Sequence, residues 1–171
     1  MQSFIFQDDE SIATFIKPVE NYLDRLHKHS TRNSGKNVFT KLYESLTWPR
    51  LLSYAAIKIL KNKGAYTAGV DGITRGYFMR TFEYQIQQIR SLIVQGYNPE
   101  AVMRVYIPKR NGDKRPLGIP VLQDRIIQEA IRMILEAIYE PHFAEGSHGF
   151  RIGRSTRDCQ KDCFAFLQAR K

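Results

Sequence analysis

The chain has 171 residues, of which 43% are hydrophobic and 12% aromatic; this composition suits a buried core and excludes a wholly disordered chain. Its formal net charge of +9 favours a polyanionic partner, nucleic acid before an anionic membrane surface. The sequence contains no apolar run of bilayer-spanning length, and residues 1–11 resemble neither a secretory signal nor a transit peptide. We therefore expect a soluble protein that is not secreted and has no membrane partner, in a bacterial cytoplasm or an organelle such as the mitochondrion.

The first part of the chain is expected to be an amphipathic helix followed by a basic linker. Apolar residues recur at helical spacing over residues 11–26, within which Pro18 should cause a kink or a late helix start. Residues 28–37 are polar, basic and rich in turn formers, which indicates a linker or a loop that touches RNA. We therefore divide the chain into an N-terminal helical extension with this linker, residues 1–37, and a main domain, residues 38–171.

Three further helices are expected before the first strand. A short amphipathic helix is predicted over residues 38–46. The next should begin at Pro49 and stop before Gly64, because proline suits a first helical turn and glycine commonly follows a last one. Residues 64–76 form a glycine-rich loop, and the apolar spacing over residues 78–96 predicts one more helix.

A basic β-hairpin is predicted next. Residues 102–108 are β-branched and apolar, the Asn-Gly pair at 111–112 is a strong hairpin-turn signal, and residues 115–119 supply the return strand. Side chains alternate along a strand, so Arg104 and Tyr106 should share one face. The cations around this hairpin are Arg104, Lys109, Arg110, Lys114 and Arg115. The pattern favours phosphate binding; the alternative is a solvated basic edge that prevents strand aggregation.

A long helix should follow the hairpin, from Gln123 to Pro141. Its predicted buried stripe consists of Ile127, Ile131, Ile134 and Ile138. Its predicted surface ion pairs, spaced i, i+4, are Arg125 with Glu129 and Arg132 with Glu136. The sequence thus indicates that this helix packs along one side and is charged on the other.

The last helix should start after a loop, at a cap formed by Ser155 or Thr156. Cys159 and Cys163 share a face of this helix. We interpret them as small core residues and not as half of a metal site, because no second pair of ligands follows. The nearby carboxylates, Asp158 and Asp162, are interpreted as solvated surface. The chain as a whole is predicted to be an α+β domain, mostly helical, with one short antiparallel hairpin.

Several of these segments resemble group II intron reverse transcriptases. Residues 63–65, Lys-Gly-Ala, and 69–72, Gly-Val-Asp-Gly, resemble the opening block of that family. Residues 104–156, with an IPK…RPLGIP hairpin, a DR-x-x-Q helix and a GFR-x-GRS loop, resemble the next two blocks. This combination is specific to the family and extends over residues 38–171, whereas residues 1–37 have no match.

The resemblance implies that these blocks form the fingers of a right-hand polymerase. Lys109 and Arg115 would then lie against the triphosphate of an incoming nucleotide, where lysine supplies a point charge and arginine a fork of donors. The GFR loop would place Phe150 against the template and the nascent pair, with charge from Arg151 and Arg154. The alternative for Phe150 is packing in the core.

The resemblance also implies that the helices that precede the first block bind intron RNA. The candidates there are Lys58, Lys61 and Lys63. The chain departs from the family pattern at Ile152, where proline is usual, and at Met103, where arginine is frequent.

The family's catalytic carboxylates lie in a palm that follows these blocks, and the sequence ends at Lys171 without a Tyr-Ala-Asp-Asp turn. Two-metal phosphoryl transfer needs such carboxylates, so we expect no catalytic residue and no cofactor in this chain, with Mg²⁺ only in a complete palm. The expected function is binding of structured RNA, intron or ribosomal. The chain would be part of a split maturase with a palm-bearing partner, or a recruited component of a ribonucleoprotein such as an organellar ribosome. The alternatives are a piece of an active RNA-directed DNA polymerase with its palm supplied elsewhere, and a protein-interaction domain.

Overall fold

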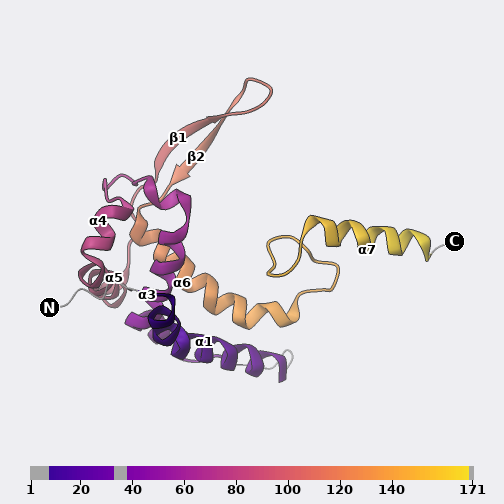
Figure 1. Ribbon diagram of the computed structural model, residues 1–171, viewed down its shortest axis with the longest axis horizontal. Helices are drawn as coiled ribbons and strands as arrows, with labels where there is room; N and C mark the ends of the chain where they lie inside the picture. The colour runs from indigo at the N-terminus through magenta and orange to yellow at the C-terminus, as the bar shows by residue number, and fades with distance from the viewer. Residues whose placement is uncertain (1–7, 33–37, 170–171) are drawn as a thin grey trace.

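The computed structural model describes residues 8–32 and 38–169, and it consists of helices with one two-stranded antiparallel sheet (Figure 1). The elements are α1 (Asp9–Arg32), α2 (Leu42–Leu46), α3 (Pro49–Lys61), the 3-10 turn η1 (Lys63–Tyr66), α4 (Arg75–Arg80), α5 (Phe82–Gly96), β1 (Met103–Pro108), β2 (Lys114–Ile119), α6 (Leu122–Tyr139), the 3-10 turn η2 (Glu140–His142) and α7 (Thr156–Gln168). The expected mostly helical α+β class is confirmed. None of the described helices is long and apolar enough to cross a bilayer.

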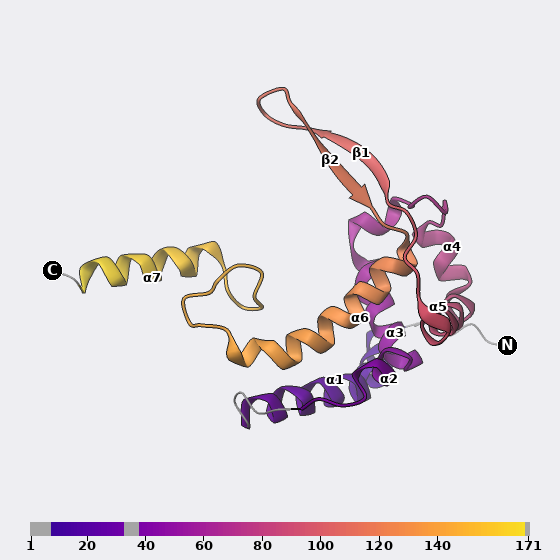
Figure 2. The same ribbon diagram turned by 180° about the vertical axis from the view of Figure 1, so that it is seen from behind.

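The core forms where α1 and α3 pack against α6, with α5 on the other side of α3 (Figure 2). Each of these helices repeats apolar residues every three or four positions, so one face can leave water, at about 0.8 kcal/mol per buried CH₂ group. Leu52 of α3, Ile89 of α5 and Ile126 of α6 are fully buried in this core. Val19 of α1 is fully buried as well, so the N-terminal helix shares the core of the domain that follows it.

The first helix is longer than predicted at both ends. It begins at Asp9, well before Pro18, so of the two expected effects of Pro18, a kink or a late start, the late start does not occur. Residues 28–32, which we expected in a linker, are helical. Their polar character has a structural use, because the buried hydroxyl of Ser30 donates a hydrogen bond of 2.6 Å to the carbonyl of Ile138 near the end of α6. The remainder of the predicted linker, residues 33–37, lies outside the described residues.

Two predicted helices differ in their boundaries because single residues interrupt them. Lys41 has a left-handed backbone with a φ of 63°, so α2 does not extend back over residues 38–41. The single helix predicted over residues 78–96 is two helices, α4 and α5, separated at Thr81. The rings of Phe78 and Phe82 still meet edge to face across that break, at 6.0 Å between centroids, and this apolar spacing conceals the break in the sequence.

The β-hairpin is confirmed, and it projects from the helical body (Figure 1). Gly112 of the Asn-Gly pair supplies the left-handed residue of the turn, with a φ of +88°, and the amide of Asn111 donates to the carboxylate of Asp113 at 2.8 Å. Tyr106 lies opposite Pro116 in the register. Because proline has no N–H to give to the ladder, these two form a non-hydrogen-bonded pair, in which side chains approach most closely.

The long helix α6 buries a slightly different stripe from the one predicted. Ile127, Ile134 and Ile138 are buried as expected, but the side chain of Ile131 is 37% exposed. The buried face is centred on residues such as Ala130, which leaves Ile131 at its margin. The prediction that α6 is buried along one side is therefore confirmed. The buried side is rotated about the helix axis by a fraction of a turn from the predicted one.

The last helix, α7, is capped by Ser155, one of the two predicted caps, and extends away from the helical body (Figure 1). It has no buried residue in the described chain: Cys159 is half-buried and Cys163 is exposed, so the prediction that they are core residues is wrong. Asp158 closes a capping box, because Ser155 N–H donates to its Oδ2 at 3.0 Å and the N–H of Asp158 points back to the Ser155 hydroxyl. Within the described residues, no three His, Cys, Asp or Glu side chains gather as a metal site would require.

Replacement of Gly69 by alanine should destabilise the fold. A Cβ at that position would lie 2.7 Å from the Cα and 2.8 Å from the N of Val121, so the backbone before α6 would have to move. We expect a loss of about 1–3 kcal/mol in the free energy of unfolding, measured by urea titration. Gly76→Ala is the matched control, because a Cβ there meets nothing within 4 Å and alanine favours the helix α4. Equal unfolding midpoints for the two variants would contradict this close approach.

The capping box makes the order of α7 dependent on pH. Hydrogen bonds from Ser155 lower the pKa of Asp158. The cap is therefore complete above the carboxyl's unfolded pKa, about 3.9, and is lost as the pH falls through the lower folded value. A helix of 13 residues with no buried face depends on such local contacts. Amide hydrogen exchange should show protection of α7 that declines on acidification, and Asp158→Asn should remove this decline. An unchanged decline in the variant would place its origin elsewhere.

Candidate nucleic-acid interface

The hairpin is fastened to the helical body at its root by one guanidinium, that of Arg125. Its Nε donates to the carbonyl of Pro120 at 2.8 Å, its Nη1 to that of Gly64 at 2.8 Å, and its Nη2 to that of Thr67 at 2.9 Å. The planar fork of arginine suits three carbonyls that arrive from different directions. The predicted pair of Arg125 with Glu129 is therefore wrong, because the carbonyls use the donors that we had assigned to that ion pair.

A buried carboxyl adjoins this fastening. Asp124 is 3% exposed, and its Oδ1 has no hydrogen-bond partner within the described residues. Burial is the largest influence and raises the pKa of Asp124, while a hydrogen bond with the backbone of Glu100 lowers it. The start of α6 is thus tied on one side to η1 through Arg125 and on the other to the chain that enters β1.

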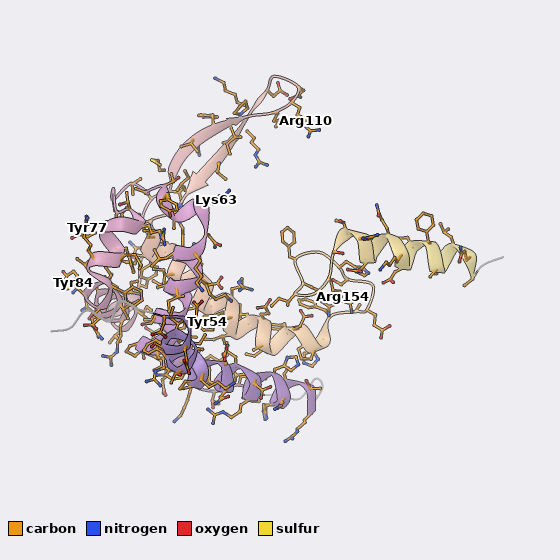
Figure 3. The ribbon with its side chains drawn as sticks, in the orientation of Figure 1. Tyr54, Lys63, Tyr77, Tyr84, Arg110 and Arg154 are labelled. Atoms are coloured by element: carbon orange, nitrogen blue, oxygen red, sulfur yellow. The ribbon has the colours of Figure 1, made fainter. Side chains whose placement is uncertain are left out.

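The strand register divides the hairpin cations between two faces and a tip. Arg104 shares one face with Tyr106, as predicted, because exposure alternates along β1. Lys114 lies opposite Pro108 on that same face, whereas Arg115 lies opposite Ile107 on the other. The two remaining cations, Lys109 and Arg110, occupy the turn; Figure 3 shows Arg110 at the tip. A polyanion could therefore reach cations from either side of the ribbon.

These five cations are free to take phosphate ligands. All are exposed, and their side chains make no hydrogen bond or ion pair with any residue in the described ranges 8–32 and 38–169. The hairpin contains one carboxylate, Asp113, which the amide of Asn111 already engages at 2.8 Å. An incoming phosphate therefore need not break an internal ion pair, and binding costs only the ordering of exposed side chains.

The three lysines predicted at the end of α3 are not equivalent. Lys61 and Lys63 are exposed, and Figure 3 shows Lys63 beside the root of the hairpin. Lys58 instead lies 3.2 Å from a carboxylate oxygen of Glu129, which Arg132 also binds at 2.8 Å. Burial alone would raise the pKa of Glu129, but hydrogen bonds from Arg132 and Lys58 lower it overall. Lys58 thus belongs to a structural ion-pair network, while Lys61 and Lys63 extend the basic surface of the hairpin.

The GFR loop does not present its arginine as predicted. The side chain of Arg151 is 9% exposed and faces inward, where its guanidinium bonds the Glu140 carboxylate at 2.8 Å and 2.9 Å. It also donates to the carbonyls of Ala144 at 3.0 Å and Ser147 at 2.8 Å. We therefore assign Arg151 to closing its own loop. Its contact with RNA stays a prediction that this geometry does not favour.

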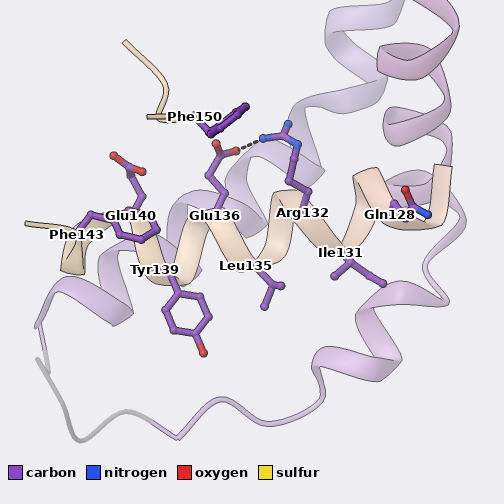
Figure 4. Close-up of a pocket in the computed structure, with 9 residues that line it drawn as sticks. All are labelled: Gln128, Ile131, Arg132, Leu135, Glu136, Tyr139, Glu140, Phe143 and Phe150. Atoms are coloured by element: carbon purple, nitrogen blue, oxygen red, sulfur yellow. Dashed lines mark hydrogen bonds and ion pairs between the residues drawn. The ribbon is translucent and has the colours of Figure 1, made fainter. Parts of the chain in front are cut away.

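The neighbouring Phe150 is fully exposed, so the alternative of core packing is wrong for the described chain. Its φ is 58°, a left-handed conformation that costs a residue other than glycine about 1–2 kcal/mol. The ring lies at the rim of an open groove of about 490 Å³ along α6, with apolar side chains such as Leu135 and Tyr139 on its walls (Figure 4). Arg154 donates to the carbonyl of Glu145 and so braces the same loop.

The predicted site residues therefore fall into two groups at opposite ends of α6. The hairpin precedes the start of α6 at Leu122, and the GFR loop follows the end of α6 at Tyr139 (Figure 1). A helix of 18 residues is about 27 Å long, so the hairpin root and the loop cannot contact one phosphate together. The hairpin group, with Lys61 and Lys63, is the candidate nucleic-acid interface.

Comparison with known proteins finds that the chain is homologous to group II intron-encoded proteins and intron maturases, although no family model matches it. It is 43% identical over 148 residues to the group II intron-encoded protein LtrA of Lactococcus lactis subsp. cremoris, covering 85% of this chain and 24% of that protein. It is 36% identical over 150 residues to an uncharacterized 91 kDa protein in the cob intron of Schizosaccharomyces pombe, covering 86% of this chain and 18% of that protein. It is 38% identical over 55 residues to nuclear intron maturase 4, mitochondrial, of Arabidopsis thaliana, covering 32% of this chain and 7% of that protein. The chain thus spans a quarter or less of the length of these relatives.

Replacement of Arg125 by lysine should loosen the root of the hairpin. One ammonium cannot reproduce a fork that reaches three carbonyls, and an unsatisfied hydrogen bond to a charged donor costs about 1.5–3 kcal/mol. We expect a loss of that size in urea unfolding, with faster amide exchange in β1 and β2. Arg132→Lys on the same helix is the matched control, because its half-exposed ion pairs should cost less than about 1 kcal/mol. Equal losses in the two variants would contradict the role of Arg125.

Proposed function

Because this chain is homologous over 85% of its length to a group II intron-encoded protein, we propose that it binds structured RNA through the exposed cations of its β-hairpin. The observation that carries the proposal is the hairpin itself, where five unpaired cations accompany a single, already engaged carboxylate. The RNA of first choice is that of a group II intron, the element named in the description of LtrA.

Phosphate contacts would dominate this binding. The cations lie on both faces and at the tip of a hairpin whose root is fixed, so they can meet a folded polyanion without first ordering a loop. A folded RNA offers its backbone from several directions, which suits such a distribution better than a single extended strand does. We propose Lys61 and Lys63 as further RNA contacts at the root of the hairpin. The alternative, a protein-interaction domain whose basic surface is incidental, is distinguished by the experiment below.

The resemblance to polymerase fingers supports a related use of the same cations. In a complete reverse transcriptase, Lys109 and Arg115 of the fingers would contact the triphosphate of an incoming nucleotide. The palm of that enzyme would bind Mg²⁺. We propose that the described residues bind RNA without catalysis of their own, whether in a split maturase, in a recruited ribonucleoprotein or as one part of a polymerase. The proposed division of the chain at residue 37 separates no independent core, because α1 shares the core of the residues that follow it. A bacterial or mitochondrial location would agree with the sources of the relatives.

The salt dependence of RNA affinity tests the proposal. Lys109→Ala/Arg115→Ala should weaken binding to a folded intron RNA, and the slope of log affinity against log salt should become shallower by about 2, because about one counterion is released per phosphate contact. The control Lys17→Ala/Arg25→Ala removes the same charge from exposed positions of α1. Fluorescence anisotropy at several salt concentrations measures both slopes.

Three results are decisive. A shallower slope for the hairpin variant alone supports the proposal. An equal change in both variants would reveal a general effect of net charge and no hairpin site. An unchanged slope in the hairpin variant would show that Lys109 and Arg115 do not contact the RNA.

A further inference from the structure

One face of the hairpin carries an exposed tyrosine between two cations. Tyr106 is 60% exposed, and its side chain makes no hydrogen bond or ring contact within the part of the chain that the structure describes. It lies opposite Pro116, so the two apolar rings occupy adjacent positions of one non-hydrogen-bonded pair. An aromatic ring held on a strand in this way presents a large apolar surface with few freely rotating bonds.

The cations are placed evenly on either side of this ring. Arg104 precedes Tyr106 by two residues on the same face, and Lys114 lies opposite Pro108, two residues beyond it. At about 3.3 Å per strand residue, each cation stands about 6.6 Å from the ring along the hairpin. The face therefore alternates charge, aromatic surface and charge.

The face of the hairpin that carries Tyr106 is not the face that packs toward the rest of the protein. The other face of β1 carries Val105 and Ile107, which are half-buried, and the alternation turns Tyr106 away from them. On the tyrosine face, Val102 folds over Gly118, where an added Cβ would lie 3.1 Å from a Val102 methyl group. Arg104, opposite Gly118, lies between this contact and Tyr106, so the aromatic ring is bordered by cations along the hairpin.

We propose that Tyr106, together with Pro116, is a stacking platform for an unpaired base of the bound RNA, while Arg104 and Lys114 hold the phosphates on either side of that base. The inference rests on the proposed RNA binding and adds the structural feature that is recognised: a bulged or looped-out nucleotide within a folded RNA. Bases stack on exposed aromatic rings whatever their sequence, and neighbouring cations bind the backbone. The excess of cations over the one carboxylate of the hairpin favours RNA over a protein strand as the occupant.

Three RNA duplexes that differ in one position test this inference with the full chain. One is fully paired, one carries a single bulged nucleotide, and one carries an abasic residue at the bulge. We expect the base-bearing bulge to bind more tightly than the other two by about 5- to 150-fold, the range of one base stacked on an aromatic ring. Tyr106→Leu should remove this preference, and Tyr106→Phe, which retains the ring, should keep it.

Tyr84→Leu is the matched control, because Tyr84 is 61% exposed on α5, away from the hairpin. Its bulge preference should equal that of the unchanged protein. The inference is overturned if the unchanged protein binds all three duplexes equally, or if Tyr106→Leu keeps the preference; salt-dependent binding of all three duplexes would then leave the proposed function standing. Failure of the unchanged protein to bind any of them, or a folded intron RNA, would instead sink the proposed function.

Discussion

The arrangement of this protein depends on a single half-buried guanidinium that satisfies three carbonyls. Arg125 joins the turn after α3 to the segment that links β2 to α6, so the helical core and the hairpin share one rigid joint. A two-stranded ribbon has no third strand to support it and is marginal by itself in water. With its root fixed, the ribbon can present charge to solvent without a core of its own. Beside this joint lies a buried carboxyl, that of Asp124, and burial raises its pKa.

The same helix that receives the hairpin also organises the other end of the molecule. α6 packs against α1 and α3, begins at the basic ribbon and ends at a loop that Arg151 closes from within. Arginine therefore has two opposite uses in this chain: unpaired on the hairpin, and fully engaged in the loop. Net charge alone does not distinguish these uses, and only the unpaired group supports a nucleic-acid interface.

Local signals in the sequence were sufficient for the hairpin, for the start of α3 at Pro49 and for the cap at Ser155, because turn, proline and capping chemistry act over a few residues. The partners of Arg125 could not be predicted, since two of its three carbonyl acceptors lie 61 and 58 residues away in the chain and carbonyls leave no mark on the sequence. Arg151 was misplaced for a related reason: its acceptors Glu140 and Ser147 become neighbours only when the loop closes. The cysteines of α7 were assigned to a core by residue type, although that helix has no buried residue in the part of the chain that the structure describes. The sequence was thus sufficient to predict the set of cations in the candidate site. It was not sufficient to predict which of these cations have no partner within the described residues.

The two prolines of the ribbon limit what the sheet can become. Pro116 and Pro108 lie at non-hydrogen-bonded positions, where an ordinary residue would direct its N–H outward from the ribbon. Each strand therefore lacks an outward donor on its free side, and a third strand could not complete a ladder along either one. A ribbon that projects into solvent would otherwise be a template for fibre growth between copies. The two prolines therefore disfavour growth of this sheet beyond its two strands.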